Sequence, residues 1–194
     1  MSTHRIDLPF RADHVGSLLR PAELHRAREA AAGGQASPAQ LRAAEDAAIA
    51  TAVERLAATG IRSLTDGEFR RTFFHLDFLE QLDGVAVTGR IPSSSGSEAT
   101  VGFTPPKLSV VGPLRHGRDI QVDDFRFLAS TIAGLGATAA GAVAKVCIPS
   151  PTMVHFRGGR AAIDIDAYPD LELFFADLAR CYQAEIAALY EAGC

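Results

Sequence analysis

The sequence predicts an α/β fold built from parallel (β/α) units. Two observations support this: strands and helices alternate along the chain, and polar clusters follow the predicted strands. Such alternation is typical of a parallel sheet with right-handed crossovers. The pattern gives roughly four units, whereas a closed (β/α)8 barrel needs eight units and about 250 residues. Half of a TIM barrel and an open doubly wound sheet both fit this pattern.

Composition places the chain among ordinary globular proteins. Its 194 residues are 47% hydrophobic and 22% charged, which predicts a single domain over residues 1–194. The net charge of -4 argues against nucleic acid as a partner. The N-terminus lacks a signal-peptide core, and no apolar run reaches membrane-spanning length. We therefore expect a cytoplasmic protein with no membrane partner.

The first half of the chain predicts two helices and a short strand. Residues 21–34 have proline at a favoured first position and a Gly-Gly stop. Ser37 resembles an N-cap that opens a second helix over residues 37–60. The strand at 61–65 then leads directly into the polar motif "LTDGEFRR".

The second half continues the alternation. After an amphipathic segment at 73–84, the Ser/Gly-rich residues 89–100 predict a surface loop. Strands are expected at 105–114 and 142–151, with a helix at 122–136 between them. A last helix follows, and its spacing predicts one apolar stripe, formed by Leu171, Phe174, Phe175, Leu178, Tyr182, Ile186 and Leu189.

The three cysteines predict neither a disulfide framework nor a zinc site. They are odd in number, far apart and in no C-x-x-C pair. Cys147 and Cys181 are expected to be small buried apolar residues, while the setting of the terminal Cys194 is open. The six histidines have no metal-ligand spacing among themselves. We expect no complete metal site in this chain.

The cluster "DHVGSLLRP", at residues 13–21, is expected just past the first predicted strand. Gly16 permits close backbone approach, and Ser17 offers a hydroxyl with free backbone N–H groups. His14 could act as a base or polar contact. A structural histidine and a helix-capping serine fit the same residues, so the sequence leaves both interpretations open.

The "LTDGEFRR" motif is equally ambiguous by spacing alone. Asp66 and Glu68 could bind an ammonium group, and Arg70 and Arg71 could hold a carboxylate. Alternatively, one of the two acids caps a helix that begins near Thr72. Pocket rim and capping turn are both compatible with this pattern.

Two proline-rich stretches could also shape a pocket. Pro105-Pro106 stiffens the entry of one strand, and Pro149 and Pro151 bracket Ser150 at the end of the next. His155 and Arg157 follow one short turn later. These prolines either only begin and end the strands or form part of a pocket wall, and the sequence allows both interpretations.

Taken together, the clusters resemble the cobalamin-independent methionine synthase family, in its short form related to the C-terminal catalytic barrel. The matching stretches are "RADHVGSLLRP", "LTDGEFRRTFFHLDFLEQLDG", "KLSVVGPL", "AKVCIPSPTMVHFRGG" and "YPDLELFFADLARCYQAEIAALYEAGC". They occur in the family's order from residue 11 to the end. The resemblance implies a (β/α)8 barrel, and thus half of a closed barrel for this chain.

The family's chemistry implies substrates and a metal. A zinc-bound homocysteine thiolate attacks the methyl group of 5-methyltetrahydrofolate, because the thiolate is the nucleophile. In this resemblance "HVGS" binds the amino acid substrate, with His14, Val15, Gly16 and Ser17 as its residues. Glu68 falls on the family glutamate that contacts the substrate amino group.

The chain also departs from the family pattern. The family's zinc ligands and its substrate-binding aspartate lie on later strands that have no counterpart in this sequence. We therefore expect a truncated N-terminal half with no metal ligands or catalytic residues of its own, inactive alone. Such a half is expected to self-associate or to pair with a missing C-terminal half, because open strand edges invite pairing.

Two alternatives to methionine synthesis stay open. Related enzymes apply zinc-thiolate chemistry to other thiols such as coenzyme M, or take the methyl group from another donor. The other alternative is a non-catalytic half-barrel that serves in binding or assembly.

Overall fold

The computed structural model describes residues 13–90 and 106–194, which form two compact units. Within the described residues, the first unit contains 13–71, 122–147 and 192–194, and the second contains 72–90, 106–121 and 148–191. Each unit has its own hydrophobic core.

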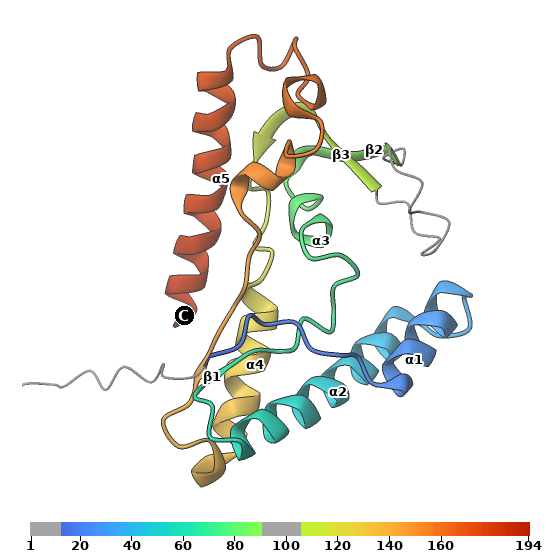
Figure 1. The fold of residues 1–194 in the computed structure, drawn as a ribbon, viewed down its shortest axis with the longest axis vertical. Coiled ribbons are helices and arrows are strands. Elements are labelled where there is room, and N and C mark those ends of the chain that lie inside the picture. The colour runs from blue at the N-terminus through green and yellow to red at the C-terminus, as the bar shows by residue number, and fades with distance from the viewer. Residues whose placement is uncertain (1–12, 91–105) are drawn as a thin grey trace, which may run out of the picture. The chain divides into compact units, whose positions relative to one another are not determined.

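The first unit contains helices α1 (Ala22–Ala32), α2 (Pro38–Ala58) and α4 (Val122–Gly134). It also contains the short strands β1 (Ser63–Leu64) and β4 (Val143–Ala144) and the 3-10 helix η2 (Gly136–Ala139). All three helices confirm the sequence-based predictions. Figure 1 shows α1 and α2 as a helical hairpin, and the two helices are in contact.

The start of α2 is fixed by a capping box. The Ser37 hydroxyl accepts a hydrogen bond from Gln40 N at 3.2 Å, and Gln40 Oε1 accepts one from Ser37 N at 2.7 Å. This arrangement pairs two N–H groups that a helix start leaves without partners. The predicted N-cap is therefore confirmed, and the polar pair stops the helix from extending into the Gly33-Gly34 turn.

The core of the first unit joins the helices to the parallel strand pair. Ser63 pairs with Val143 and Leu64 with Ala144, so β1 and β4 run parallel. The buried residues of this core are Leu24, Ile49, Val53, Ala57, Leu64, Phe69, Leu128, Ile132 and Ala139. This packing places the ends of β1 and β4 next to each other, where the polar motifs follow.

The second unit contains strands β2 (Asp83–Arg90) and β3 (Pro106–Arg115), helices α3 (Leu76–Leu79) and α5 (Leu171–Glu191), and 3-10 helices η3 (Pro151–Val154) and η4 (Gly159–Ala162). Strands β2 and β3 pair antiparallel, with Val85 opposite Val110 and Val87 opposite Leu108. Helix α5 packs against β3.

The strand expected at 105–114 exists, but its role differs from the prediction. It forms a hairpin with β2 instead of joining a run of parallel strands, and its one parallel contact is a bridge from Val110 to Ile163. The mixed α/β character is confirmed, while a barrel is not formed by the described residues. Gly84 allows the hairpin, since it adopts φ +84° and a Cβ there would lie 2.5 Å from the Pro113 carbonyl oxygen.

Other elements also differ from expectation. The strands predicted at 61–65 and 142–151 are reduced to the two-residue strands β1 and β4. Helix α3 covers only Leu76–Leu79 of the predicted 73–84 segment, because the Asp77 carboxylate instead accepts hydrogen bonds from Thr72 N and Phe73 N. Of the polar segment 89–100, the first two residues end β2 and the remainder lies outside the described residues.

The predicted apolar stripe of α5 is only partly correct. Phe174, Leu178, Tyr182 and Leu189 are buried, whereas Leu171, Phe175 and Ile186 are 37%, 45% and 54% exposed. Cys181 and Glu185 complete the buried face in their place. One face of the helix is formed by residues 174, 178, 181, 185 and 189, which are three or four positions apart. Residues 175 and 186 each follow a residue of this face and therefore point away from it. Among the described residues, no helix is long and apolar enough to cross a membrane.

Candidate functional site

The "HVGS" segment, His14–Ser17, lies beside β1 in the first unit without forming a strand itself. His14 Nε2 lies 3.1 Å from the Ser63 carbonyl oxygen, and Leu18 N donates to the Gly67 carbonyl at 3.0 Å. Val15 is 87% exposed, whereas Gly16 is buried. The backbone is therefore held against β1 while the Val15 side chain points into solvent.

Glu68 is a buried carboxylate in an unusual backbone conformation. Its side chain is only 7% exposed, and its φ of +56° is the left-handed conformation, the sole such case among the described non-glycine residues. A left-handed residue with a side chain costs roughly 1–2 kcal/mol. Such conformations persist where the surroundings impose them, and they cluster at functional sites.

Three neighbours hold the Glu68 backbone and side chain in place. Asp66 Oδ1 accepts a hydrogen bond from Glu68 N at 2.8 Å, which closes an Asx turn. Arg20 donates to the carbonyl oxygens of Glu68 and Arg71, and the Arg71 guanidinium pairs with the Glu68 carboxylate. Neither Asp66 nor Glu68 caps a helix, so the capping interpretation of the motif is wrong.

Gly16 and Glu68 meet at one point, together with Cys147. A Cβ on Gly16 would lie 2.8 Å from Glu68 Oε1 and 2.9 Å from Cys147 Sγ. The absence of a side chain at Gly16, with its φ of +150°, is what lets the glutamate and the loop backbone approach. The sequence-predicted residues 14–17 and 68 are thus brought together, with the Ser17 side chain exposed. Their role in binding a substrate stays a prediction.

Arg70 has a structural position. Its guanidinium pairs with Asp46 and Asp124, each at 2.8 Å, and lies 4.8 Å from the centre of the Phe127 ring. At 8% exposure, this arginine is committed to holding the motif against α2 and α4. Arg71 is engaged by Glu68, so both arginines have partners within the protein.

Charges around the motif shift several pKa values. Burial raises the pKa of Asp66, and the nearby Asp124 carboxylate raises it further. Burial also raises the pKa of the Cys147 thiol, which keeps it protonated near neutral pH. Hydrogen bonds from Lys145 and Ser63 lower the pKa of Asp13 to about 2. The site therefore combines a charged ion pair at its start with a neutral thiol beside Glu68.

Sequence reasoning missed the residues that line up behind the "HVGS" backbone. Lys145, Cys147 and Thr65 each donate a hydrogen bond to a carbonyl oxygen of this segment. The expectation of a merely apolar Cys147 is wrong, because its thiol is half-buried and donates to Val15 O at 2.7 Å. A usable signal was the alternation of Lys145 and Cys147, which places both side chains on one face of an extended strand.

The proline-rich lip at 149–151 lies in the second unit. Tyr182 donates to the Pro149 carbonyl at 2.9 Å, and Ser150 and Thr152 hydroxyls lie 3.0 Å apart. His155 packs edge-on against the rings of Phe174 and Phe175, and burial lowers its pKa. These contacts are those of a rigid packed turn.

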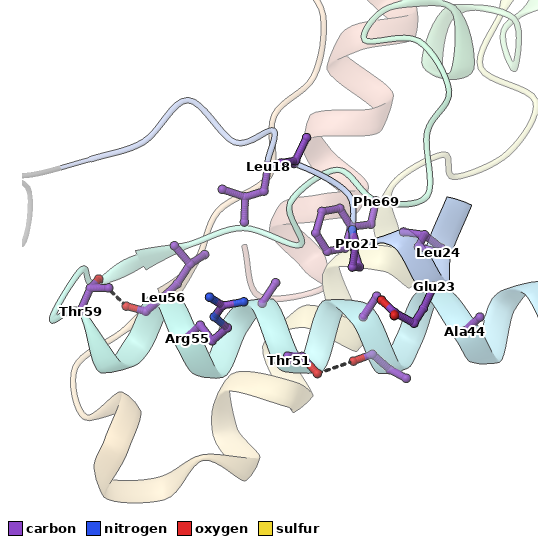
Figure 2. A pocket seen from close by; sticks show the side chains of 14 residues that line it. Leu18, Pro21, Glu23, Leu24, Ala44, Thr51, Arg55, Leu56, Thr59 and Phe69 are labelled. Atoms are coloured by element: carbon purple, nitrogen blue, oxygen red, sulfur yellow. Dashed lines mark hydrogen bonds between the residues drawn. The ribbon is translucent and has the colours of Figure 1, made fainter. Parts of the chain in front are cut away.

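A groove of about 610 Å³ runs along α2 in the first unit (Figure 2). Its lining residues are mostly apolar: Leu18, Leu19, Pro21, Glu23, Leu24, Ala44, Ala47, Ala48, Thr51, Ala52, Arg55, Leu56, Thr59 and Phe69. Leu18 directly follows Ser17, and Phe69 directly follows Glu68, but none of the site residues 14–17 and 68 lines the groove. Glu23 and Arg55 supply its charged groups.

The residues described do not fit a zinc ion. Across 13–90 and 106–194, no three His, Cys, Asp or Glu side chains gather in an arrangement that could hold a metal. Structural and catalytic zinc sites need three or four such ligands. No step through zinc can therefore be built on these side chains.

Comparisons with known proteins place this geometry in context. No protein-family model matches the chain. It is 40% identical over 186 residues to the uncharacterized protein YxjH of Bacillus subtilis and 39% identical over 194 residues to YxjG of the same organism. These alignments cover 96% and 100% of the chain, but 46% and 48% of the two relatives. The chain thus spans about half the length of the curated relatives it matches.

Solved structures likewise match nearly all of this chain and about half of their own length. A candidate vitamin-B12-independent methionine synthase from Listeria monocytogenes is 38% identical and superposes with a TM-score of 0.74, over 96% of this chain and 50% of that one. A B12-independent methionine synthase from Shewanella, solved with selenomethionine, shares the fold at 21% identity and a TM-score of 0.65, over 92% of this chain and 48% of that one. The chain is therefore similar, along nearly its whole length, to about half of proteins assigned as B12-independent methionine synthases.

Proposed function

We propose that this chain supplies the amino-acid-binding part of a cobalamin-independent methyltransferase that transfers a methyl group to the thiol of homocysteine. The observation that carries the proposal is the meeting of Glu68 with the Gly16 backbone, at the end of β1. The similarity to the Listeria protein over 96% of the chain supports it.

The Glu68 carboxylate and the backbone N–H groups of the "HVGS" segment together suit the two charged groups of an α-amino acid. Arg71 pairs with Oε2 of the buried Glu68 carboxylate, and Oε1, which lies beside Gly16, can accept from an ammonium group; charge-assisted hydrogen bonds are the stronger ones. Backbone N–H groups at Val15, Gly16 and Ser17 offer donors for the substrate carboxylate, as does the Ser17 hydroxyl. In this arrangement the chain binds and orients the substrate, and it makes no covalent bond to it.

The Glu68 carboxylate favours homocysteine over coenzyme M as the methyl acceptor. Homocysteine carries an ammonium group that Glu68 can pair with, whereas coenzyme M carries a sulfonate and no ammonium. A sulfonate beside Glu68 would place like charges together in a buried site, which is unfavourable. We therefore propose homocysteine as the acceptor, with 5-methyltetrahydrofolate as the methyl donor and zinc as the thiolate-activating metal of the whole enzyme.

Calorimetric titration of the chain with L-homocysteine and L-methionine tests this proposal. We expect both amino acids to bind, coenzyme M not to bind, and Glu68→Gln to weaken binding by about tenfold or more, since a charged hydrogen bond contributes about 1.5–3 kcal/mol. Glu54→Gln, an exposed position on α2, is the matched control. Unchanged affinity in Glu68→Gln, or no binding by the unmodified chain, would contradict the proposal.

A further inference from the structure

The "HVGS" segment is held by side chains where a strand would be held by a backbone ladder. Three successive carbonyl oxygens each accept a hydrogen bond from a different side chain. Lys145 Nζ donates to His14 O at 2.5 Å, Cys147 Sγ to Val15 O at 2.7 Å, and Thr65 Oγ1 to Gly16 O at 2.7 Å. These contacts fix three consecutive peptide planes.

The three donors form one platform. Lys145 and Cys147 are two residues apart and follow β4, while Thr65 directly follows β1. Lys145 N donates to the Leu64 carbonyl at 2.8 Å, which continues the parallel pairing beyond the strand ends. The platform is therefore an extension of the sheet that presents side chains to the segment.

The first donor is itself anchored. The Lys145 ammonium also pairs with Asp13 Oδ2 at 2.7 Å, and Asp13 accepts a second hydrogen bond from the Ser63 hydroxyl. Residue 13 is thus tied to both β1 and the segment after β4. This arrangement limits rotation of the His14 peptide, because Asp13 holds the Lys145 ammonium that donates to the His14 carbonyl oxygen.

Fixing the carbonyls also fixes the N–H groups. In a trans peptide the N–H points opposite to the C=O, so the N–H groups of Val15, Gly16 and Ser17 face away from the three donors. Within the described part of the chain these N–H groups donate no hydrogen bond. Each of these N–H groups is therefore held on the side of its own peptide plane opposite the side-chain donor.

We propose that Thr65, Lys145 and Cys147 are positioning residues, which set the "HVGS" backbone in the orientation that an amino acid substrate requires. The inference rests on the proposed function for the identity of the ligand. The orientation of the segment itself follows from the hydrogen bonds alone. The raised pKa of the Cys147 thiol agrees with this role, because only the protonated sulfur can donate.

A pair of substitutions at Cys147 separates positioning from packing. Cys147→Ala removes the donor, while Cys147→Ser replaces the thiol by a hydroxyl of similar size that can donate to Val15 O. Backbone NMR order parameters of Val15, Gly16 and Ser17 are the direct measurement. We expect values near those of rigid backbone, about 0.85, in the unmodified chain and in Cys147→Ser, and a fall toward about 0.6 in Cys147→Ala.

Affinity for L-methionine is the second measurement. Loss of one hydrogen bond should weaken binding about fivefold in Cys147→Ala, with Cys147→Ser restoring it to within about twofold. Lys145→Met, which has no donor, should lower the order parameters in the same way through the His14 carbonyl. Cys181→Ala, at a buried cysteine of the second unit, is the control and should leave both measurements unchanged.

The two measurements also separate this inference from the proposed function. Rigid Val15–Ser17 amides in Cys147→Ala, or equal loss in the alanine and serine variants, would overturn the positioning role. If the unmodified chain binds no methionine but its order parameters follow the expected pattern, the proposed substrate is wrong and the positioning stands.

Discussion

Glu68 of the first unit and Glu185 of the second, both buried, illustrate opposite uses of the same side chain. Glu185 lies on the buried face of α5 and is 0% exposed, while Glu68 lies in a loop after β1 and is 7% exposed. Glu185 accepts hydrogen bonds from His116 Nε2 at 2.7 Å, Ile120 N at 2.9 Å and Gln121 N at 2.7 Å. Both carboxylate oxygens of Glu185 therefore hold the segment that follows β3 against α5.

Glu68 is held differently. Its backbone is left-handed, its N–H donates to Asp66, and its carboxylate pairs with Arg71 and closely approaches Gly16, where no Cβ would fit. A glutamate in relaxed helical geometry with its oxygens fully engaged stabilises the fold. One kept in a costly left-handed conformation contributes less to stability than its burial suggests, and such residues cluster at functional sites.

The largest expected effect is at Glu185. Substitution Glu185→Ala leaves two partly buried backbone N–H groups and His116 without an acceptor, and we expect the free energy of unfolding to fall by about 3 kcal/mol or more. Urea denaturation measures this loss. Glu191→Ala, an exposed position on the same helix, should change stability by less than about 0.5 kcal/mol. A similar small change in Glu185→Ala would remove the distinction drawn between the two glutamates.

The sequence predicted the local elements of this contrast well. Helices α1, α2, α4 and α5 follow from caps and from 3.6-residue periodicity, which depend on neighbouring residues. The pairing of β2 with β3 depends on residues that lie far apart in the chain, so local pattern could assign β3 but not its antiparallel partner. Glu185 was overlooked because a charged residue within an apolar stripe is usually exposed.

The site was predicted only in part, for the same reason. The residues of "HVGS" and Glu68 were identified through a family resemblance, and the structure brings them together. The left-handed conformation of Glu68 was not foreseeable, since that conformation ordinarily predicts glycine or asparagine. The supporting role of Lys145 and Cys147 depends on a contact between segments about 130 residues apart, which no local pattern encodes.

An intermediate effect on stability is expected at Glu68. Substitution Glu68→Asn or Glu68→Gly relieves the left-handed strain of about 1 kcal/mol while it removes the ion pair with Arg71, which is partly exposed and can turn to solvent. The free energy of unfolding should therefore change by no more than about 1 kcal/mol, although binding of L-methionine is lost. Denaturation and calorimetry on the same samples measure both. A destabilisation as large as that of Glu185→Ala would make Glu68 a structural residue.

The smallest and most specific effect is expected at Asp66, whose carboxylate forms the turn that holds Glu68. Asp66→Asn retains an oxygen that can accept from Glu68 N and removes a charge that burial and Asp124 disfavour. Because the pKa of Asp66 is raised in the folded state, its contribution to stability is fully present below its ordinary pKa of 3.8 and is lost as pH rises through the raised value.

Asp66→Asn lacks this loss, so its stability relative to the unmodified chain should increase from about pH 4 upward and then become constant. Asp66→Ala, which also removes the turn, should instead be less stable by about 1 kcal/mol at neutral pH. Thermal denaturation across this pH range measures the difference between the two variants. If Asp66→Asn is destabilised as much as Asp66→Ala at neutral pH, then the charge of Asp66, and not its hydrogen bond, holds Glu68 in its left-handed conformation.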